Sequence, residues 1–125
     1  MVGTLPATGY HPGGLAWDGD HLWQVDCDTR QLIRTETEDG KVSRKVNSPG
    51  FYPTGLAYDG FHFWSADAAT GRIYRLRSTN GRADAVIDAQ AFLRPGEFVS
   101  LAWGDDQLWI ASASHPSIVR MEILR

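Results

Sequence analysis

The stretch "PTGLAYDGFHFWSAD", residues 53–67, repeats with small changes the stretch "PGGLAWDGDHLWQVD", residues 12–26. A third copy of its opening phrase, Leu101-Ala102-Trp103, occurs later in the chain. One tryptophan marks the same point of each copy, and the spacings are 41 residues from Trp23 to Trp64 and 45 residues from Trp64 to Trp109. The chain therefore consists of three repeats, and a period of this length is typical of the four-stranded blades of a β-propeller.

The residues within each repeat predict short antiparallel strands. Asp18-Gly19 and Asp59-Gly60 are pairs that favour tight hairpin turns in which both central residues have positive φ. Alternating apolar and polar residues flank these turns in "HLWQVD" (21–26) and "HFWSAD" (62–67), and two further strands follow in each repeat. No window has the apolar spacing of an amphipathic helix, and 13 Gly and 6 Pro interrupt every candidate. The sequence therefore predicts an all-β protein made of three four-stranded antiparallel blades.

The boundaries of the repeats predict a single three-blade unit over residues 1–125. Residues 1–11 match a fourth strand that completes another blade, followed by the loop that leads into the next strand. Residues 12–52 form blade one, residues 53–95 blade two, and residues 96–125 a third blade that lacks its fourth strand.

Three blades do not close a ring, because propellers usually have four to eight blades. We therefore expect two chains to join head to tail as a homodimer with six blades, in which Val2 to Leu5 complete blade three of the partner. The alternative is that the 125 residues are a fragment of a longer propeller of six or seven blades.

Composition excludes several classes of partner. Hydrophobic residues make up 42% of the chain, charged residues 22%, and the net charge is −3. The twelve basic residues are scattered, so we expect no nucleic-acid partner. The sequence has no apolar run of membrane-spanning length and no signal-like N-terminus, so we expect no membrane association and a cytoplasmic location. Cys27 is the sole cysteine, which excludes an intrachain disulfide and a cysteine-based zinc cluster.

The phrase "GLAWDGDHLWQVD", with "TRQLIRTETEDGKV" after it, resembles the blades of the streptogramin-lyase, NHL and glutamine-cyclotransferase-like propellers. Their blades commonly read G-L-A-[WY]-D-G, then L-W-x-A-D, then G-x-I-x-[RV]. The resemblance covers essentially the whole chain and implies a propeller fold. It also implies that the shared positions are scaffold, since enzymes and binding proteins of this type have them in common.

The repeat separates scaffold residues from candidate site residues, because residues that recur do the same packing in each blade. We expect the recurring aromatic residues to lie in the blade cores: Trp17, Tyr58, Trp103, Trp23, Trp64 and Trp109. Asp26 and Asp67 precede the second turn and should accept hydrogen bonds from its backbone. A repeated structural role is also expected for His21 and His62, and for the trio Arg34, Arg75 and Arg120.

The position just before each inner strand breaks the repeat. An ungapped alignment places His11, Tyr52 and Glu97 there. In propellers this end of the inner strands surrounds the mouth of the central channel, so we expect a ligand site at that mouth. The predicted ligand-binding residues are Tyr10, His11, Phe51, Tyr52, Arg94, Glu97, Phe98 and His115, with Cys27 and Asp28 in the neighbouring second-turn loop.

Two functions fit these residues. The first is a binding or interaction module, in which the aromatic residues stack on a small molecule, a sugar or a protein ligand. The alternative is a metal-assisted lyase or lactone hydrolase, in which His11 and Glu97 act as a general base and acid or bind a divalent cation. A nucleophilic role for Cys27 is disfavoured, because its sequence neighbours are acidic. Variable residues at these positions are also compatible with plain solvated loops.

Overall fold

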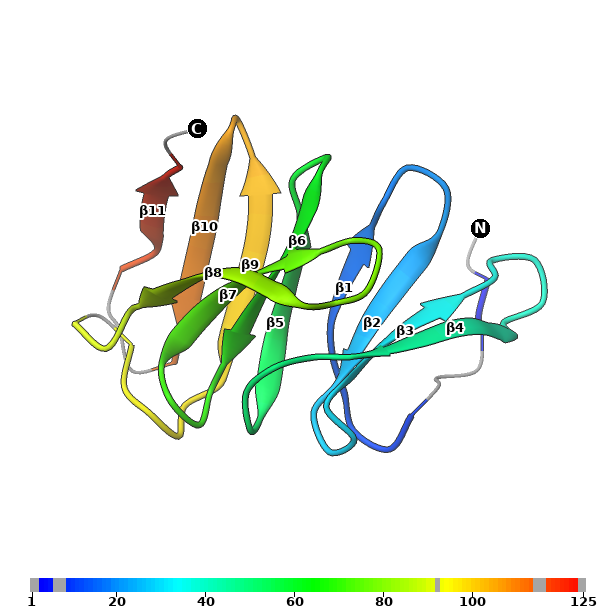
Figure 1. Ribbon diagram of the computed structural model, residues 1–125, viewed down its shortest axis with the longest axis horizontal. Coiled ribbons are helices and arrows are strands. Elements are labelled where there is room, and N and C mark those ends of the chain that lie inside the picture. The colour runs from blue at the N-terminus through cyan, green and yellow to red at the C-terminus, as the bar shows by residue number, and fades with distance from the viewer. Residues whose placement is uncertain (1–2, 6–8, 92, 114–116, 124–125) are drawn as a thin grey trace.

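The computed structural model describes residues 3–5, 9–91, 93–113 and 117–123, and these residues form only β-strands, turns and loops (Figure 1). Three antiparallel sheets follow one another along the chain, with strand orders β1-β2-β3-β4, β5-β6-β7-β8 and β11-β10-β9. The strands are β1 (Pro12–Trp17), β2 (Leu22–Asp26), β3 (Gln31–Thr35), β4 (Val42–Asn47), β5 (Pro53–Tyr58), β6 (His62–Asp67), β7 (Arg72–Arg77), β8 (Ala83–Asp88), β9 (Val99–Gly104), β10 (Gln107–Ser112) and β11 (Val119–Glu122). The all-β prediction is confirmed. Among the described residues, no helix has the length and apolar character needed to cross a membrane.

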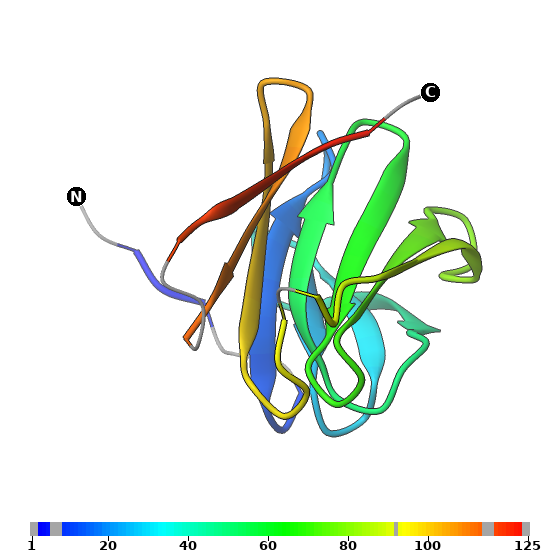
Figure 2. The same cartoon turned by 90° about the vertical axis from the view of Figure 1, so that its left-hand side faces the viewer.

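The first strand of each sheet is the innermost one. β1 packs against β5, and β5 packs against β9, so that the three inner strands lie side by side across the molecule (Figures 1 and 2). Two glycines allow this close approach: a Cβ on Gly14 would lie 2.7 Å from the backbone N of Leu56, and a Cβ on Gly55 would lie 2.9 Å from the carbonyl O of Val99. The recurring glycine of the repeat is therefore a requirement of backbone packing between neighbouring inner strands.

The core consists of two apolar layers, one between each pair of neighbouring sheets. Trp23 of β2 projects into the first layer and meets the ring of Phe63, with ring centroids 5.1 Å apart. Trp64 of β6 projects into the second layer and packs among Leu108 and Ile110 of the third sheet. The first and second sheets therefore each present a tryptophan-bearing face to the sheet that follows, as the period of the sequence predicts.

The buried tryptophans are held by the hairpin turns beside them. The indole N–H of Trp23 donates to Asp18 over 2.7 Å, and that of Trp64 donates to Asp59 over 2.9 Å. In the third sheet the indole N–H of Trp109 donates instead to the carbonyl of Gly104, over 3.0 Å. The repeated Asp-Gly pair thus serves the core as well as the turn.

Two expectations about the scaffold need correction. In the Asp-Gly turns the positive φ falls on the glycine alone, 103° at Gly19 and 99° at Gly60, whereas the turn with two positive φ values is Asp105-Asp106, at 55° and 57°. The aromatic residue that follows Leu-Ala in each repeat is also not buried in every blade. Trp17 is 53% exposed, because it lies on the side of β1 that faces away from the second sheet.

Candidate functional site

Three similar loops lead into the inner strands and lie at one end of them. We call residues 9–11, 50–52 and 96–98 the inner-strand loops. Each begins with a glycine of positive φ, at 87° for Gly9, 94° for Gly50 and 92° for Gly96. The strands β1, β5 and β9 start directly after these loops. Any residue that follows the glycine by the same number of positions is therefore placed equivalently in all three blades.

The register of the sheets changes which residue of the third blade occupies the site. β1 and β5 each contain an irregularity with an extra residue, between Pro12 and Leu15 and between Pro53 and Gly55, whereas β9 pairs with β10 without interruption. The ungapped alignment is therefore off by one residue before the inner strand of blade three. Phe98, and not Glu97, is the equivalent of His11 and Tyr52.

One buried aspartate holds each of the first two inner-strand loops in place. Oδ1 of Asp26 accepts hydrogen bonds from the backbone N–H groups of Tyr10 and His11, at 3.1 and 2.6 Å, while Oδ2 accepts from the backbone and hydroxyl of Thr29. Asp67 does the same for Phe51 and Tyr52, at 3.2 and 2.7 Å. The expected bonds to the second turn are confirmed. The added bonds to the inner-strand loop position His11 and Tyr52 through their own backbone.

His11, Tyr52 and Phe98 come together at this end of the inner strands. The hydroxyl of Tyr52 lies 2.9 Å from Nδ1 of His11. The ring of Phe98 lies 6.2 Å from the ring of His11 and 5.9 Å from that of Tyr52, measured between centroids. We call these three residues the aromatic triad. Each blade contributes one member of it, and the members differ where the scaffold repeats.

The charges around the triad favour a neutral phenol. Partial desolvation, together with the nearby Cys27, Asp28 and Asp26, raises the pKa of Tyr52. Tyr52 therefore keeps its proton at neutral pH and can donate it to Nδ1 of His11. The carboxylate of Asp28 lies 3.6 Å from the same nitrogen, close enough to attract an imidazolium if His11 is protonated.

Cys27 lies beneath the inner-strand loop and is 1% exposed. Its backbone N–H donates to the carbonyl of His11 over 2.9 Å. Burial, and then the charges of Asp26 and Asp28, raise the pKa of the thiol to about 11. The thiolate that a nucleophile requires is therefore scarce at neutral pH. This agrees with the sequence, which disfavours a nucleophilic role for Cys27.

The remaining predicted site residues form a rim or lie elsewhere. The side chains of Tyr10 and Phe51 are 85% and 69% exposed, directly beside the triad in sequence. Glu97 occupies the equivalent rim position in blade three, and Arg94 is exposed in the same loop, where its carbonyl accepts from the backbone N–H of Glu97. His115 lies outside the described residues.

The acid–base pair of the alternative function is not assembled in the described part of the chain. No hydrogen bond or ion pair there joins Glu97 to His11, whose polar partners are Tyr52 and Asp28. The residues that the structure describes also contain no group of three or more His, Cys, Asp or Glu side chains arranged to hold a metal ion. The described geometry provides hydrogen-bonding and aromatic groups at this end of the inner strands.

A cavity of about 340 Å³ lies next to the triad, along the starts of the three inner strands. Phe98 belongs to its lining, together with Pro12, Thr54 and Leu101. Sequence reasoning placed Phe98 beside the site and missed its membership of the triad. The glycine spacing gave the signal: Gly9 to Gly50 is 41 residues, while Gly50 to Gly96 is 46, one more than the spacing of 45 between Leu56 and Leu101.

Solved structures with a similar fold are β-propellers. Glutaminyl cyclase of Myxococcus xanthus aligns with a TM-score of 0.77 and 14% identity, over 94% of this chain and 57% of that one. A luciferin-regenerating enzyme aligns with a TM-score of 0.67 and 17% identity, over 91% of this chain and 45% of that one. For virginiamycin B lyase of Staphylococcus aureus the TM-score is 0.56 and the identity 17%, over 91% of this chain and 42% of that one.

The fold is that of a partial β-propeller. A scan against protein-family models finds no match, and neither does a search of curated protein sequences. The chain spans between 42% and 57% of the length of the three structures named above. At these identities the similarity establishes the architecture and leaves the function to the site.

Proposed function

We propose that this partial propeller is a binding module that takes a small molecule at the aromatic triad, at the channel mouth. The observation that carries the proposal is the meeting of His11, Tyr52 and Phe98, one from each blade, beside the cavity of about 340 Å³. A cavity of this size is in the range of small-molecule sites. Phe98 is 51% exposed and offers a ring face for stacking, while His11 and Asp28 offer polar groups that can orient a ligand.

Saturation-transfer NMR with a panel of monosaccharides and aromatic carboxylic acids tests this site. Ligands that receive magnetisation from the protein should lose at least half of the signal in the Phe98→Ala and Tyr52→Phe variants. Phe61→Ala is the matched control, since Phe61 is 66% exposed in the turn between β5 and β6, at the opposite end of the inner strands. Equal losses in all three variants, or no transfer to any compound in the panel, would contradict the proposal.

We further propose that two copies close a six-bladed ring as a homodimer. The register supports this. Among the described residues, the first and third sheets each have one face that no other sheet covers, and the residues of these two faces are equivalent to residues that are buried between sheets in the other blades. Ile118 lies two residues before Arg120, the partner of Trp109 in the sheet. Leu32 in blade one and Ile73 in blade two lie at the same position before the equivalent arginines. Leu32 and Ile73 are both 0% exposed, whereas Ile118 is 70% exposed.

The opposite face of the molecule has the complementary pattern. Leu15 is 60% exposed, whereas Leu56, its equivalent in blade two, is 1% exposed against the first sheet. Leu15 and Leu22 line an apolar hollow of about 270 Å³ on the outer side of the first sheet, together with Leu5. The face that carries Ile118 therefore corresponds to the faces of blades one and two that pack against the next sheet. The face that carries Leu15 corresponds to the face of blade two that packs against the preceding sheet. A second copy supplies both partners in a head-to-tail arrangement.

Light scattering of the 125-residue chain tests the dimer. We expect a molar mass of twice 13.9 kDa, and dissociation to the single chain in Ile118→Lys and in Leu15→Lys. Val86→Lys is the control, since Val86 is 54% exposed on β8 and belongs to neither open face. A wild-type protein of 13.9 kDa at all concentrations would contradict the dimer and leave the ligand site to be tested on its own.

A further inference from the structure

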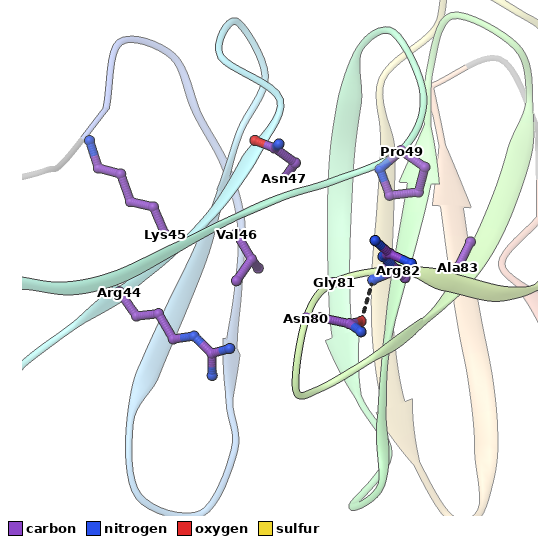
Figure 3. A pocket seen from close by; sticks show the side chains of 9 residues that line it. All are labelled: Arg44, Lys45, Val46, Asn47, Pro49, Asn80, Gly81, Arg82 and Ala83. Atoms are coloured by element: carbon purple, nitrogen blue, oxygen red, sulfur yellow. Dashed lines mark hydrogen bonds between the residues drawn. The ribbon is translucent and has the colours of Figure 1, made fainter.

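A third hollow, of about 730 Å³, lies between the outer strand of the first sheet and a turn of the second sheet (Figure 3). One wall is β4, with Arg44, Lys45 and Asn47. The other wall is the turn between β7 and β8, with Asn80 and Arg82. We call this hollow the basic groove. It shares no residue with the aromatic triad or with the inner-strand loops.

The turn is held firmly against β4. Gly81 has a φ of +72°, and a Cβ there would lie only 2.7 Å from the carbonyl O of Asn47, so only glycine fits between the two walls. Within the turn, the side-chain Oδ1 of Asn80 accepts from the backbone N–H of Arg82 over 2.9 Å (Figure 3). The guanidinium of Arg44 reaches across and donates to the carbonyl of Thr79. The groove is therefore a fixed junction between two sheets.

The lining of the basic groove contains three cations and no carboxylate: Arg44, Lys45 and Arg82. The hydrogen bond of Arg44 to Thr79 goes to a neutral acceptor, and no ion pair to Lys45 or Arg82 is found among the described residues. In Figure 3 the side chain of Arg44 extends from β4 toward the turn, and Arg82 lies on the turn across from it, whereas Lys45 leaves β4 on the opposite side and adds its charge at the edge of the groove. This concentration of positive charge occurs in a chain whose net charge is −3.

Comparison with the copy of this turn in blade one shows that the cation of the turn recurs but that the lack of acidic residues is specific to the groove. The two turns have the same backbone bonds, from Gly40 N to Glu36 O and from Gly81 N to Arg77 O, both 2.9 Å. With the period of 41 residues, Glu38 and Asp39 of the blade-one turn become Thr79 and Asn80 in the turn that lines the groove. The acidic residues of the repeat are thus absent where the turn faces the basic strand.

The strand that forms the other wall also departs from the repeat, because it carries basic residues that its copy in blade two lacks. Arg44 and Lys45 of β4 correspond to Ala85 and Val86 of β8, again 41 residues apart. A scaffold role would be expected to repeat the same residue types, because the two strands occupy the same place in their sheets. Both walls of the basic groove therefore depart from the repeat, and both departures make the groove more positive.

We propose that the basic groove binds a small anion that carries phosphate-type oxyanion groups. Guanidinium and ammonium groups are the side chains that recognise such anions, and the amides of Asn47 and Asn80 add uncharged donors. The groove has no aromatic residue in its lining, so the phosphate-type group itself provides the recognition, without stacking of a base. The volume accommodates an anion with two or more such groups.

Inorganic pyrophosphate is the probe for this proposal, titrated into the full 125-residue chain with amide NMR detection at low ionic strength. We expect saturable shifts at β4 and at residues 79–83. Affinity should fall about tenfold in Arg82→Gln, as a charged contact of this kind contributes on the order of a factor of ten. It should fall by less in Lys45→Gln, because the Lys45 side chain leaves β4 on the side opposite to Arg44 and attracts the anion from a greater distance. Neither Arg82 nor Lys45 donates a side-chain hydrogen bond to another described residue, so both variants should fold as the wild type does.

Lys41→Gln is the matched control, because Lys41 occupies in the blade-one turn the place that Arg82 occupies in the groove. Its affinity for pyrophosphate should equal that of the wild type. Equal losses in Lys41→Gln and Arg82→Gln would show nonspecific attraction of anions and overturn the proposal. Unsaturated shifts, shifts away from the groove, or the same response to sodium chloride at matched ionic strength would overturn it as well.

Discussion

Replacement of Asp67 tests whether one carboxylate holds an inner-strand loop in place. Asp67 is 1% exposed and accepts hydrogen bonds from the backbone N–H groups of Phe51, Tyr52 and Ala69, at 3.2, 2.7 and 3.3 Å, and from the hydroxyl of Thr70 at 2.8 Å. In Asp67→Ala these donors lose their acceptor in a protein interior, where an unpaired donor is unfavourable. Asp67→Asn keeps one carbonyl oxygen for the inner-strand loop and turns an amide toward Thr70.

The magnitude follows from the number of short bonds. A hydrogen bond to a charged group contributes about 1.5–3 kcal/mol, and two of the four are short, so Asp67→Ala should lower the free energy of unfolding by about 3 kcal/mol. Asp67→Asn should lower it by about half as much. Asp39→Ala is the control, since Asp39 is exposed and, within the described part of the chain, accepts a hydrogen bond from the backbone N–H of Lys41 alone. Its effect should stay within about 0.5 kcal/mol.

Urea unfolding followed by tryptophan fluorescence measures these differences, at one protein concentration so that association contributes equally. With a slope of about 2 kcal/mol per molar urea, a loss of about 3 kcal/mol moves the midpoint by about 1.5 M. The reasoning is refuted if Asp67→Ala shifts the midpoint no more than Asp39→Ala does. It is also refuted if Asp67→Asn is as damaging as Asp67→Ala, because the retained carbonyl would then contribute nothing.

Three further predictions concern a backbone position, an ion pair and the thiol. Gly50→Ala should destabilise the fold by about 2–3 kcal/mol in urea unfolding, because φ is +94° and the new Cβ would lie 2.7 Å from a buried carboxyl carbon, whereas Gly96→Ala, with φ of +92° and open space, should lose only about 1 kcal/mol. The hydrogen bond from Arg75 lowers the pKa of Asp84, so its stabilisation is present at neutral pH and is lost as the pH falls below about 4. Carboxyl NMR titration should show a higher Asp84 pKa in Arg75→Gln, and the stability difference between that variant and the wild type should shrink as the pH falls through the range in which Asp84 is protonated; an unchanged Asp84 pKa would contradict the ion pair. With a pKa of about 11, Cys27 should have about one thiolate in ten thousand at pH 7, so alkylation by iodoacetamide should be very slow and should rise steeply with pH, and fast labelling at pH 7 would contradict its burial.

Much of the fold follows from local sequence signals. The spacing of Trp23, Trp64 and Trp109 predicts the blades, because each sheet needs one large apolar side chain at the same place to pack against the next sheet. The places of the turns also follow from sequence, but their backbone conformations do not. Asp105-Asp106 forms the turn with two positive φ values although it contains no glycine, since the uninterrupted pairing of β9 with β10 leaves only two residues for the connection.

The candidate site is only partly accessible from sequence. The residues that break the repeat before the inner strands are visible in the printed sequence, and two of the three alignment positions, His11 and Tyr52, do meet. The third differs because a strand irregularity adds one residue in blades one and two and is missing in blade three. An alignment without gaps therefore exchanges Glu97 for Phe98, and with it a carboxylate for an aromatic ring.

The sequence by itself determined the period, the strand class and the positions where the blades differ, because these depend on residue types at regular spacing. Tertiary structure decided which of those positions meet. The aromatic triad depends on strand register, and the basic groove depends on the packing of a blade-two turn on a blade-one strand, with Gly81 against Asn47. Contacts of this kind join residues of different repeats, 41 residues apart for His11 and Tyr52. No local pattern encodes them, since the distance between two repeats in space is set by how whole sheets pack.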